Sequence, residues 1–268
     1  MVKQRGQARF GAKRLAGDQA HDQQAGEVFS PSRIEVVDIR KSFGRHPALK
    51  GVSLTVSQGE IVGLFGPDGA GKTVTFQCML GLLRPTSGRI MFDRRDVTRL
   101  PFYRRAILGL GYLPEQQSVF CGLTVAQNVM AMLEICEPDR AIRAARLEEL
   151  LSGLNLSHLR DAMATSLSGG ERRRCEVARA LALEPLIMIL DEPFRGIDPL
   201  TIASIKELIG EMRARDIGVL ISDQNVPEML QLIERAYVID EGRIIFEGSP
   251  EAMMHDPQVI AHYLGEEP

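Results

Sequence analysis

Gly66-Pro67-Asp68-Gly69-Ala70-Gly71-Lys72-Thr73 fits the pattern G-x-x-x-x-G-K-[ST] of a phosphate-binding loop. An apolar run, Ile61 to Phe65, leads into this stretch, and a helical pattern over Lys72 to Leu83 follows it. The glycines let the backbone close around an anion, so that successive N–H groups point at phosphate oxygens. Lys72 adds a positive charge, and the Thr73 hydroxyl can reach a bound Mg²⁺. The stretch therefore predicts a nucleoside triphosphate site between a strand and a helix.

Length and composition are those of a globular chain. With 268 residues, 44% of them hydrophobic, the chain can bury the core of one full domain. No uninterrupted apolar stretch approaches the roughly 18 residues that cross a bilayer. The cysteines are far apart and no histidine stands at metal-ligand spacing, which predicts neither a zinc site nor disulfides and favours the cytosol. The net charge of -3 argues against a nucleic-acid partner.

Residues 1–33 differ in composition from the rest. Lysines and arginines fill the first part of this segment without an acid, and a polar, Gln- and Ala-rich part follows. Without an apolar run the segment is no secretory signal, and we expect a disordered basic arm. An anionic membrane surface could attract this arm, although a solvated tail or a misassigned start explains it more simply.

The rest of the chain predicts an α/β fold. Strands are expected over Ile34–Ile39, Val52–Val56, Glu60–Phe65, Arg89–Phe92, Leu108–Leu113, Leu186–Leu190, Val219–Ser222, Ala236–Ile239 and Arg243–Phe246. Helices are expected over Thr124–Ile135, Arg140–Leu154, Gly170–Leu183 and Pro199–Arg213. The later alternation of helix and strand indicates a parallel sheet with crossover helices. We therefore expect one domain over residues 34–250 with a β-rich start, a helical insertion at about 116–166 and a helical tail at 251–268.

A pair of carboxylates, Asp191-Glu192, stands at the exit of the apolar strand Leu186–Leu190. A phosphate-loop enzyme needs one carboxylate to hold Mg²⁺ and a second to orient or deprotonate the attacking water. We assign the metal to Asp191 and the base to Glu192. Two acids that merely open a loop or cap a helix are the alternative, which Pro193 and the phosphate loop disfavour.

A second predicted helix N-terminus lies in Leu167-Ser168-Gly169-Gly170-Glu171. The serine hydroxyl and the backbone amides there can bind an anion. Taken alone, Ser-Gly-Gly would be an ordinary helix cap. The order along the chain decides otherwise: phosphate loop, LSGGE, apolar strand with Asp-Glu, then Gly196-Ile197-Asp198-Pro199.

This order resembles that of the ATP-binding-cassette (ABC) ATPases over nearly the whole chain after residue 33. The resemblance implies the P-loop NTPase fold, ATP and Mg²⁺ as ligands, and a homodimer that traps two ATP molecules head to tail. It implies that Ser168, Gly169 and Gly170 contact the γ-phosphate bound by the other subunit, and that Asp198 links the two sites. Phe43 stands where the family places an aromatic ring on adenine, although a core phenylalanine is the alternative.

Within this family the chain is most similar to the ATPases of lipopolysaccharide exporters. The similarity lies in Gly111–Pro114, Asn128–Ile135, Ser166–Arg174, Glu192–Pro199 and Tyr263–Glu266. The ATPases of branched-chain amino-acid importers share much of this pattern, so they remain the alternative. The resemblance implies a subunit on the cytoplasmic face of the inner membrane that drives export through integral membrane subunits.

Two departures from the family pattern affect catalysis. Gln224 replaces the family's histidine after the strand Val219–Ser222; its amide donates a hydrogen bond but cannot shuttle a proton, which predicts slower hydrolysis. Glu115-Gln116 stands where the family has a glutamine that binds Mg²⁺ and senses the membrane partner. Either Gln116 takes that role after a loop shift, or Glu115 becomes a metal ligand. A slow ATP-dependent switch is therefore a rival hypothesis, and a soluble cassette acting on DNA or ribosomes is a weaker one.

Other departures are milder. Asp68 and Val74 replace an asparagine and a threonine that are common in the family, and the added charge of Asp68 predicts weaker nucleotide affinity. By the same resemblance, Phe120 lies in the groove that receives the membrane subunits, with a core residue as the alternative. Cys121-Gly122 stands where lipopolysaccharide exporters tend to have basic residues, which leaves the docking partner open. The arginines 172–174 cannot share one helix face, and a solvated surface or intrahelical ion pairs are expected for them.

Overall fold

The computed structural model describes residues 31–265. All of the described strands and helices lie in one compact unit, which begins at residue 32. The predicted basic arm lies almost wholly outside the described residues, and its last residue, Arg33, already begins strand β1. No helix within residues 31–265 combines the length and the apolar character needed to span a bilayer.

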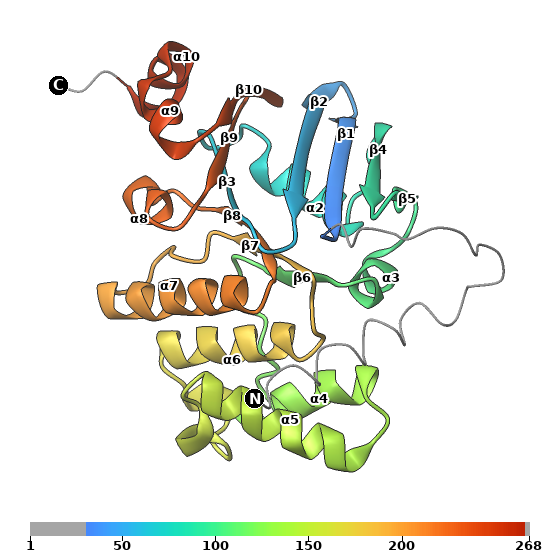
Figure 1. The fold of residues 1–268 in the computed structure, drawn as a ribbon, viewed down its shortest axis with the longest axis vertical. Coiled ribbons are helices and arrows are strands. Elements are labelled where there is room, and N and C mark those ends of the chain that lie inside the picture. Colours follow the sequence, from blue (N-terminus) through green and yellow to red (C-terminus); the bar gives the residue numbers. More distant parts are fainter. Residues whose placement is uncertain (1–30, 266–268) are drawn as a thin grey trace. The chain divides into compact units, whose positions relative to one another are not determined.

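A six-stranded sheet forms the centre of the unit, in the order β10-β9-β3-β8-β7-β6 (Figure 1). Its strands are β3 (Ile61–Phe65), β6 (Leu110–Leu113), β7 (Ile187–Asp191), β8 (Gly218–Ser222), β9 (Arg235–Asp240) and β10 (Arg243–Gly248). Neighbouring strands run parallel except for β10 against β9. Every residue of β3, β7 and β8 is buried, which explains their continuous apolar runs. The predicted parallel sheet is confirmed.

The β-rich start of the unit forms an antiparallel sheet with the strand order β2-β1-β4-β5. Its strands are β1 (Arg33–Phe43), β2 (His46–Ser57), β4 (Ser87–Phe92) and β5 (Arg95–Asp96). Helix α2 (Lys72–Leu80) follows the phosphate loop and ends earlier than predicted, because Gly81 adopts φ 75° and terminates it. The short helix α3 (Phe102–Ile107) was not predicted from the sequence.

Longer helices form a layered stack in Figure 1, with α4 and α5 next to α6 and α7 beyond it. They are α4 (Val125–Cys136), α5 (Arg140–Gly153), α6 (Gly169–Leu181) and α7 (Pro199–Ala214). Each starts within a residue of its predicted position, which confirms these helices. Short helices follow in the last part of the chain: α8 (Val226–Leu230), α9 (Pro250–His255), α10 (Pro257–Val259) and a π-helical turn (Ile260–Leu264).

The six-stranded sheet separates two apolar clusters. Ile187 and Ile189 of β7 face the cluster that contains α2 and the antiparallel sheet. Met188 and Leu190 face the cluster built by α4 to α7. This alternation follows from the two-residue period of a strand with both faces covered. The helices α2 and α6 therefore lie on opposite faces, and the loops that follow β3, β7 and β8 meet at the carboxyl edge between them.

Candidate functional site

The phosphate loop depends on glycines at both ends. Gly66 has φ 145°, and a Cβ there would lie 2.0 Å from the carbonyl oxygen of Ile239. Gly71, the residue before α2, has φ 114°, and a Cβ would lie 2.8 Å from the Leu49 side chain. Any other residue at either position would be strained and would clash. These glycines thus allow β3 to turn directly into the N-terminus of α2.

Lys72 is held against this loop. Its Nζ donates to the carbonyl oxygens of Gly66 at 2.6 Å and Pro67 at 2.9 Å, and only 7% of the residue is exposed. Burial lowers the pKa of Lys72, while the nearby Asp68, Glu192 and Asp191 oppose that shift. The loop thus presents a fixed ammonium group beside the amides of a helix N-terminus, the arrangement that binds phosphate.

Asp191 ends β7 and is almost fully buried. Burial, together with the Glu192 and Glu115 carboxylates, raises the pKa of Asp191 to about 6. The Thr73 side chain opposes this shift. Burial and the contact with Asp191 also raise the pKa of Tyr112 above its usual range.

The oxygens around Asp191 fit Mg²⁺. The ion binds through one or two carboxylates, phosphate oxygens and water, and Thr73 and Asp191 supply the protein oxygens that such a site needs. Beside Asp191 in the strand pairing, Ser222 is buried and its hydroxyl has no hydrogen-bond partner among the described residues. Residues 31–265 contain no cluster of three or more His, Cys, Asp or Glu that could hold a metal by themselves.

Glu192 follows Asp191 with a left-handed backbone, φ 46°, and its N–H donates to the Ser222 carbonyl at 2.7 Å. Its Oε2 accepts a hydrogen bond from Arg195 at 2.8 Å. The same nitrogen of Arg195 donates to Glu115 Oε1 at 2.5 Å. Glu115 is therefore joined to Glu192 through Arg195, and Glu115 and Gln116 are both exposed. The two alternatives that the sequence left open for these residues remain predictions.

Gln224 also reaches the phosphate loop. Its Nε2 donates to Asp68 Oδ1 at 3.0 Å, so two positions that depart from the family pattern contact each other. The preceding Asp223 is buried and accepts hydrogen bonds from the backbone N–H groups of Phe194 at 2.7 Å and Asn225 at 2.9 Å. Burial raises the pKa of Asp223. These bonds hold the loop after β8 against the loop after β7.

The LSGGE stretch begins α6, close to where the sequence predicted a helix start. Ser168 and Glu171 form a capping box, in which Ser168 Oγ accepts from the Glu171 N–H at 3.4 Å and the Ser168 N–H donates to Glu171 Oε2 at 2.8 Å. A Cβ on Gly170 would lie 2.7 Å from Thr201 Oγ1. The exposed Asp198 accepts from the Thr201 hydroxyl at 2.6 Å at the start of α7.

One chain does not bring all predicted site residues together. The loops after β3, β7 and β8 converge, and they carry the phosphate loop, Asp191, Glu192 and Gln224. Helix α6 packs on the opposite face of the sheet from α2, and none of the described hydrogen bonds joins Ser168–Gly170 to the phosphate loop. A second copy is needed if both features are to contact the same nucleotide.

The two aromatic candidates are exposed. Phe43 is 48% exposed at the end of β1, with Lys41 Nζ 5.2 Å from its ring centre. Phe120 is 43% exposed, and the Arg179 guanidinium lies 4.1 Å from its ring centre. The alternative that each is a core residue is wrong, since both rings are accessible to a ligand or a partner.

Sequence reasoning expected surface charges or ion pairs on α6 but did not expect a buried pair. Arg173, 7% exposed, pairs with Glu176 at 3.0 Å and also donates to the Pro114 carbonyl at 2.8 Å. A solvated surface was therefore wrong for this arginine, while an intrahelical ion pair is confirmed. The i, i+3 spacing of opposite charges was the available signal. Arg195 was also missed, because one arginine in a loop makes no pattern.

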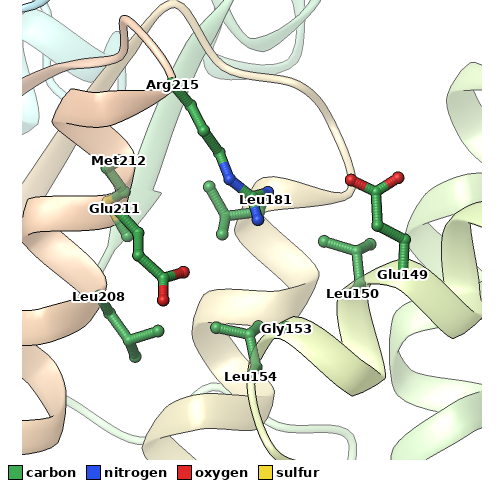
Figure 2. A pocket seen from close by; sticks show the side chains of 9 residues that line it. All are labelled: Glu149, Leu150, Gly153, Leu154, Leu181, Leu208, Glu211, Met212 and Arg215. Atoms are coloured by element: carbon green, nitrogen blue, oxygen red, sulfur yellow. The ribbon is translucent and has the colours of Figure 1, made fainter. Parts of the chain in front are cut away.

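A crevice between α5, α6 and α7 lies apart from this site (Figure 2). Leucines from these helices meet there, with the charged ends of Glu211 and Arg215 beside them. Its volume of about 10 Å³ is at the limit for a single water. The crevice is a packing gap and cannot hold a nucleotide.

The end of the chain also reaches the phosphate loop. Tyr263, in the π-helical turn, has its pKa raised by burial, and the backbone of Gly66 opposes this shift. Its ring lies 6.4 Å from that of Phe65, measured between ring centres. The helical tail therefore packs against the strand and loop that carry the nucleotide site.

Comparisons with known proteins agree with this geometry. A family model described as "ABC transporter" matches residues 49–195. The chain is 51% identical, over 85% of its length and 82% of the relative's, to a "Probable ABC transporter ATP-binding protein" of Azorhizobium caulinodans. The chain belongs to the ABC transporter family. This ABC ATPase is also 49% identical, over 87% of its length and 97% of the relative's, to the "Lipopolysaccharide export system ATP-binding protein LptB" of Acidithiobacillus ferridurans.

A second family model and solved structures extend the comparison. Residues 243–268 match a model described as "Branched-chain amino acid ATP-binding cassette transporter". The ADP conformation of MJ1267, an ATP-binding cassette, superposes with a TM-score of 0.78 at 29% identity, over 88% of this chain and all of that one. A dimeric post-hydrolysis state of the cassette MJ0796 with ADP and Pi superposes with a TM-score of 0.72 at 25% identity, over 81% and 98% of the two chains. The predicted fold class and the ATPase assignment are thereby confirmed.

Proposed function

We propose that this ABC ATPase powers a lipopolysaccharide exporter. The observation that carries the proposal is the similarity to LptB proteins, 46–49% identity over 85% or more of this chain. That similarity covers the whole catalytic domain and nearly the full length of those relatives. Transport of the same cargo is the simplest function for a chain that is this similar.

Within this proposal each residue of the site has one role. Lys72 and the loop amides bind the β- and γ-phosphates of ATP, and Phe43 stacks on the adenine. Thr73 and Asp191 hold Mg²⁺, which neutralises charge on the phosphate oxygens when bound. Glu192 accepts a proton from the attacking water, and Gln224 donates a hydrogen bond to the γ-phosphate.

A homodimer completes the site. Ser168–Gly170 begin a helix on the far face of the sheet, so they reach a nucleotide on a second chain, and Asp198 lies at the same surface. The dimeric state of MJ0796 supports this assembly, because its cassettes share the fold of this chain. Two Mg-ATP molecules are then enclosed between two copies.

The exposed ring of Phe120 supports docking of integral membrane subunits at this point. Its neighbours in the segment after β6 are bonded to α6, so the ring stands on an ordered surface. An aromatic side chain that is accessible and framed by an arginine is a common anchor of protein interfaces. Docked in this way, the ATPase itself works on the cytoplasmic face of the membrane, where ATP is available.

Two other functions have specific support. The match of residues 243–268 to branched-chain amino-acid transporters favours that cargo as the alternative. Gln224 and Glu115 favour a slowly hydrolysing switch, since neither has the chemistry of the residue that the family usually places there. Both alternatives keep the ATP-dependent dimer.

Capture of the membrane partner tests the cargo. Tagged chain is purified from detergent-solubilised membranes, and the integral proteins that copurify are identified by mass spectrometry. We expect lipopolysaccharide-export subunits, and we expect Phe120→Ala to lose them while its binding of ATP is unchanged. Amino-acid permease subunits in their place would contradict the proposal. Phosphate release by the captured complex separates a transport ATPase from a slow switch.

A further inference from the structure

The segment between β6 and α4 brings an additional carboxylate to the site. Glu115 lies at the start of this segment, and its charge and that of Glu192 both act on the buried Asp191. Like charges this close repel one another, and they also repel the phosphates of a nucleotide. A positive charge near Glu115 would reduce this repulsion.

Arg195 supplies this charge through one nitrogen atom. Its Nη1 lies 2.5 Å from Glu115 Oε1 and 2.8 Å from Glu192 Oε2. Arg195 belongs to the same turn as Glu192, because its backbone N–H donates to the Glu192 carbonyl at 3.3 Å. The arginine side chain is 55% exposed, so these ion pairs are weak enough to break during a reaction cycle.

The docking segment, Pro114–Phe120, is fastened to α6 at several points. Glu176 accepts from the Ser118 N–H at 2.5 Å, and Arg179 both donates to the Ser118 carbonyl and lies over the ring of Phe120. The chain itself connects the ring of Phe120 to Glu115 at the start of this segment, so a partner that pulls the segment away from α6 also pulls on Glu115.

We propose that Arg195 is a positioning residue, which restrains Glu192 by tying it to Glu115 until nucleotide or a docked partner draws the segment aside. The inference rests on the proposed function, because it takes Glu192 as the base. Glu192 can still accept other hydrogen bonds, but the one from Arg195 holds the direction of its carboxylate, so the group is restrained from turning toward an attacking water. Release of the arginine thus links docking to hydrolysis.

The test compares Arg195→Ala with the unaltered full-length chain. Steady-state hydrolysis is measured at saturating Mg-ATP, and affinity is measured with a fluorescent ATP analogue. We expect kcat to rise about two- to fivefold, the range that an exposed ion pair can restrain. Affinity is expected to fall by a similar factor, because Glu115 loses its counter-charge. Arg195→Lys keeps the charge and is expected to recover most of the affinity.

Arg213→Ala is the matched control. The Arg213 side chain is also 55% exposed and is paired with Glu234. Glu234 precedes β9, so it lies at the amino ends of the parallel strands, away from the nucleotide site at their carboxyl ends. We expect this variant to keep the parent kcat and affinity. An unchanged or lower kcat in Arg195→Ala would overturn the restraint.

The proposed function fails in a different way. If Glu192→Gln abolishes turnover and Arg195→Ala does not raise kcat, only the restraint is wrong. If Glu192→Gln turns over at the parent rate, the base assignment falls, and the restraint falls with it.

Discussion

Asp68 and Gln224 show how two single residues change the chemistry of an otherwise ordinary phosphate loop. Gln224 Nε2 donates to Asp68 Oδ1 at 3.0 Å, so the amide that should meet the γ-phosphate is bonded to a carboxylate. An incoming phosphate must displace that bond and approach a negative charge. Both effects weaken ATP binding, and neither adds a group that moves protons.

Asp68→Asn removes the charge and keeps an oxygen that can accept from Gln224. We expect the affinity for ATP to rise about fourfold, as Coulomb's law gives for one unit charge about 5 Å away in water. Isothermal titration calorimetry of the nucleotide-free chain measures the change. Unaltered affinity would show that the Asp68 charge is fully screened by solvent.

Gln224→His restores a side chain that can carry a proton. We expect kcat to rise about tenfold, less than the roughly hundredfold or more that a positioned acid or base contributes, because Glu192 already serves as the base. Gln224→Ala, which removes the donor altogether, is expected to fall below the parent. The three proteins are compared by phosphate release at saturating Mg-ATP. A histidine variant no faster than the parent would mean that another group limits hydrolysis.

At the scale of elements, α2 is fixed at its C-terminal end by a buried arginine. Arg105 is 1% exposed and donates to the carbonyls of Cys78 at 2.9 Å, Met79 at 2.6 Å and Leu100 at 2.9 Å. Burial lowers the pKa of Arg105 to about 10. The guanidinium thus donates to the Met79 carbonyl in the last turn of the helix and adds to the Gly81 N–H as a donor to the Cys78 carbonyl.

Arg105→Ala should therefore loosen the helix that carries Lys72. We expect the free energy of unfolding in urea to fall by about 2–4 kcal/mol, because buried carbonyls lose charged donors. Arg104→Ala, an exposed neighbour on the same helix, is expected to cost about 1 kcal/mol or less. Equal losses in the two variants would contradict the role given to Arg105.

The elements differ in how far the sequence could predict them. The apolar run of β7 and the spacing of α4 and α5 determined those elements to within two residues, because burial on one or both faces leaves a period in the sequence. Helix α3 left no such signal, since it is short and its one buried residue is an arginine. The link of Arg195 to Glu115 could not be predicted either, because it joins loops far apart in sequence.

At the scale of the whole molecule, the structure contains one half of each proposed nucleotide site. The phosphate loop opens at the carboxyl edge of the sheet, and the LSGGE helix begins on the other face. A Cβ on Gly169 would meet nothing within 4 Å, so this glycine is not required by packing within its own chain. The open space beside Gly169 could therefore receive the phosphate of a nucleotide bound to a second copy of the chain.

The central claim is that ATP closes two copies of this chain around itself. Glu192→Gln keeps the shape of the side chain and its hydrogen bond from Arg195 but removes the base, so bound ATP is not consumed. We expect light scattering after size exclusion to show a dimer with Mg-ATP and a monomer with ADP. Adding Gly169→Arg, which fits within one chain, should abolish the dimer. A monomer of Glu192→Gln at saturating Mg-ATP would contradict the account.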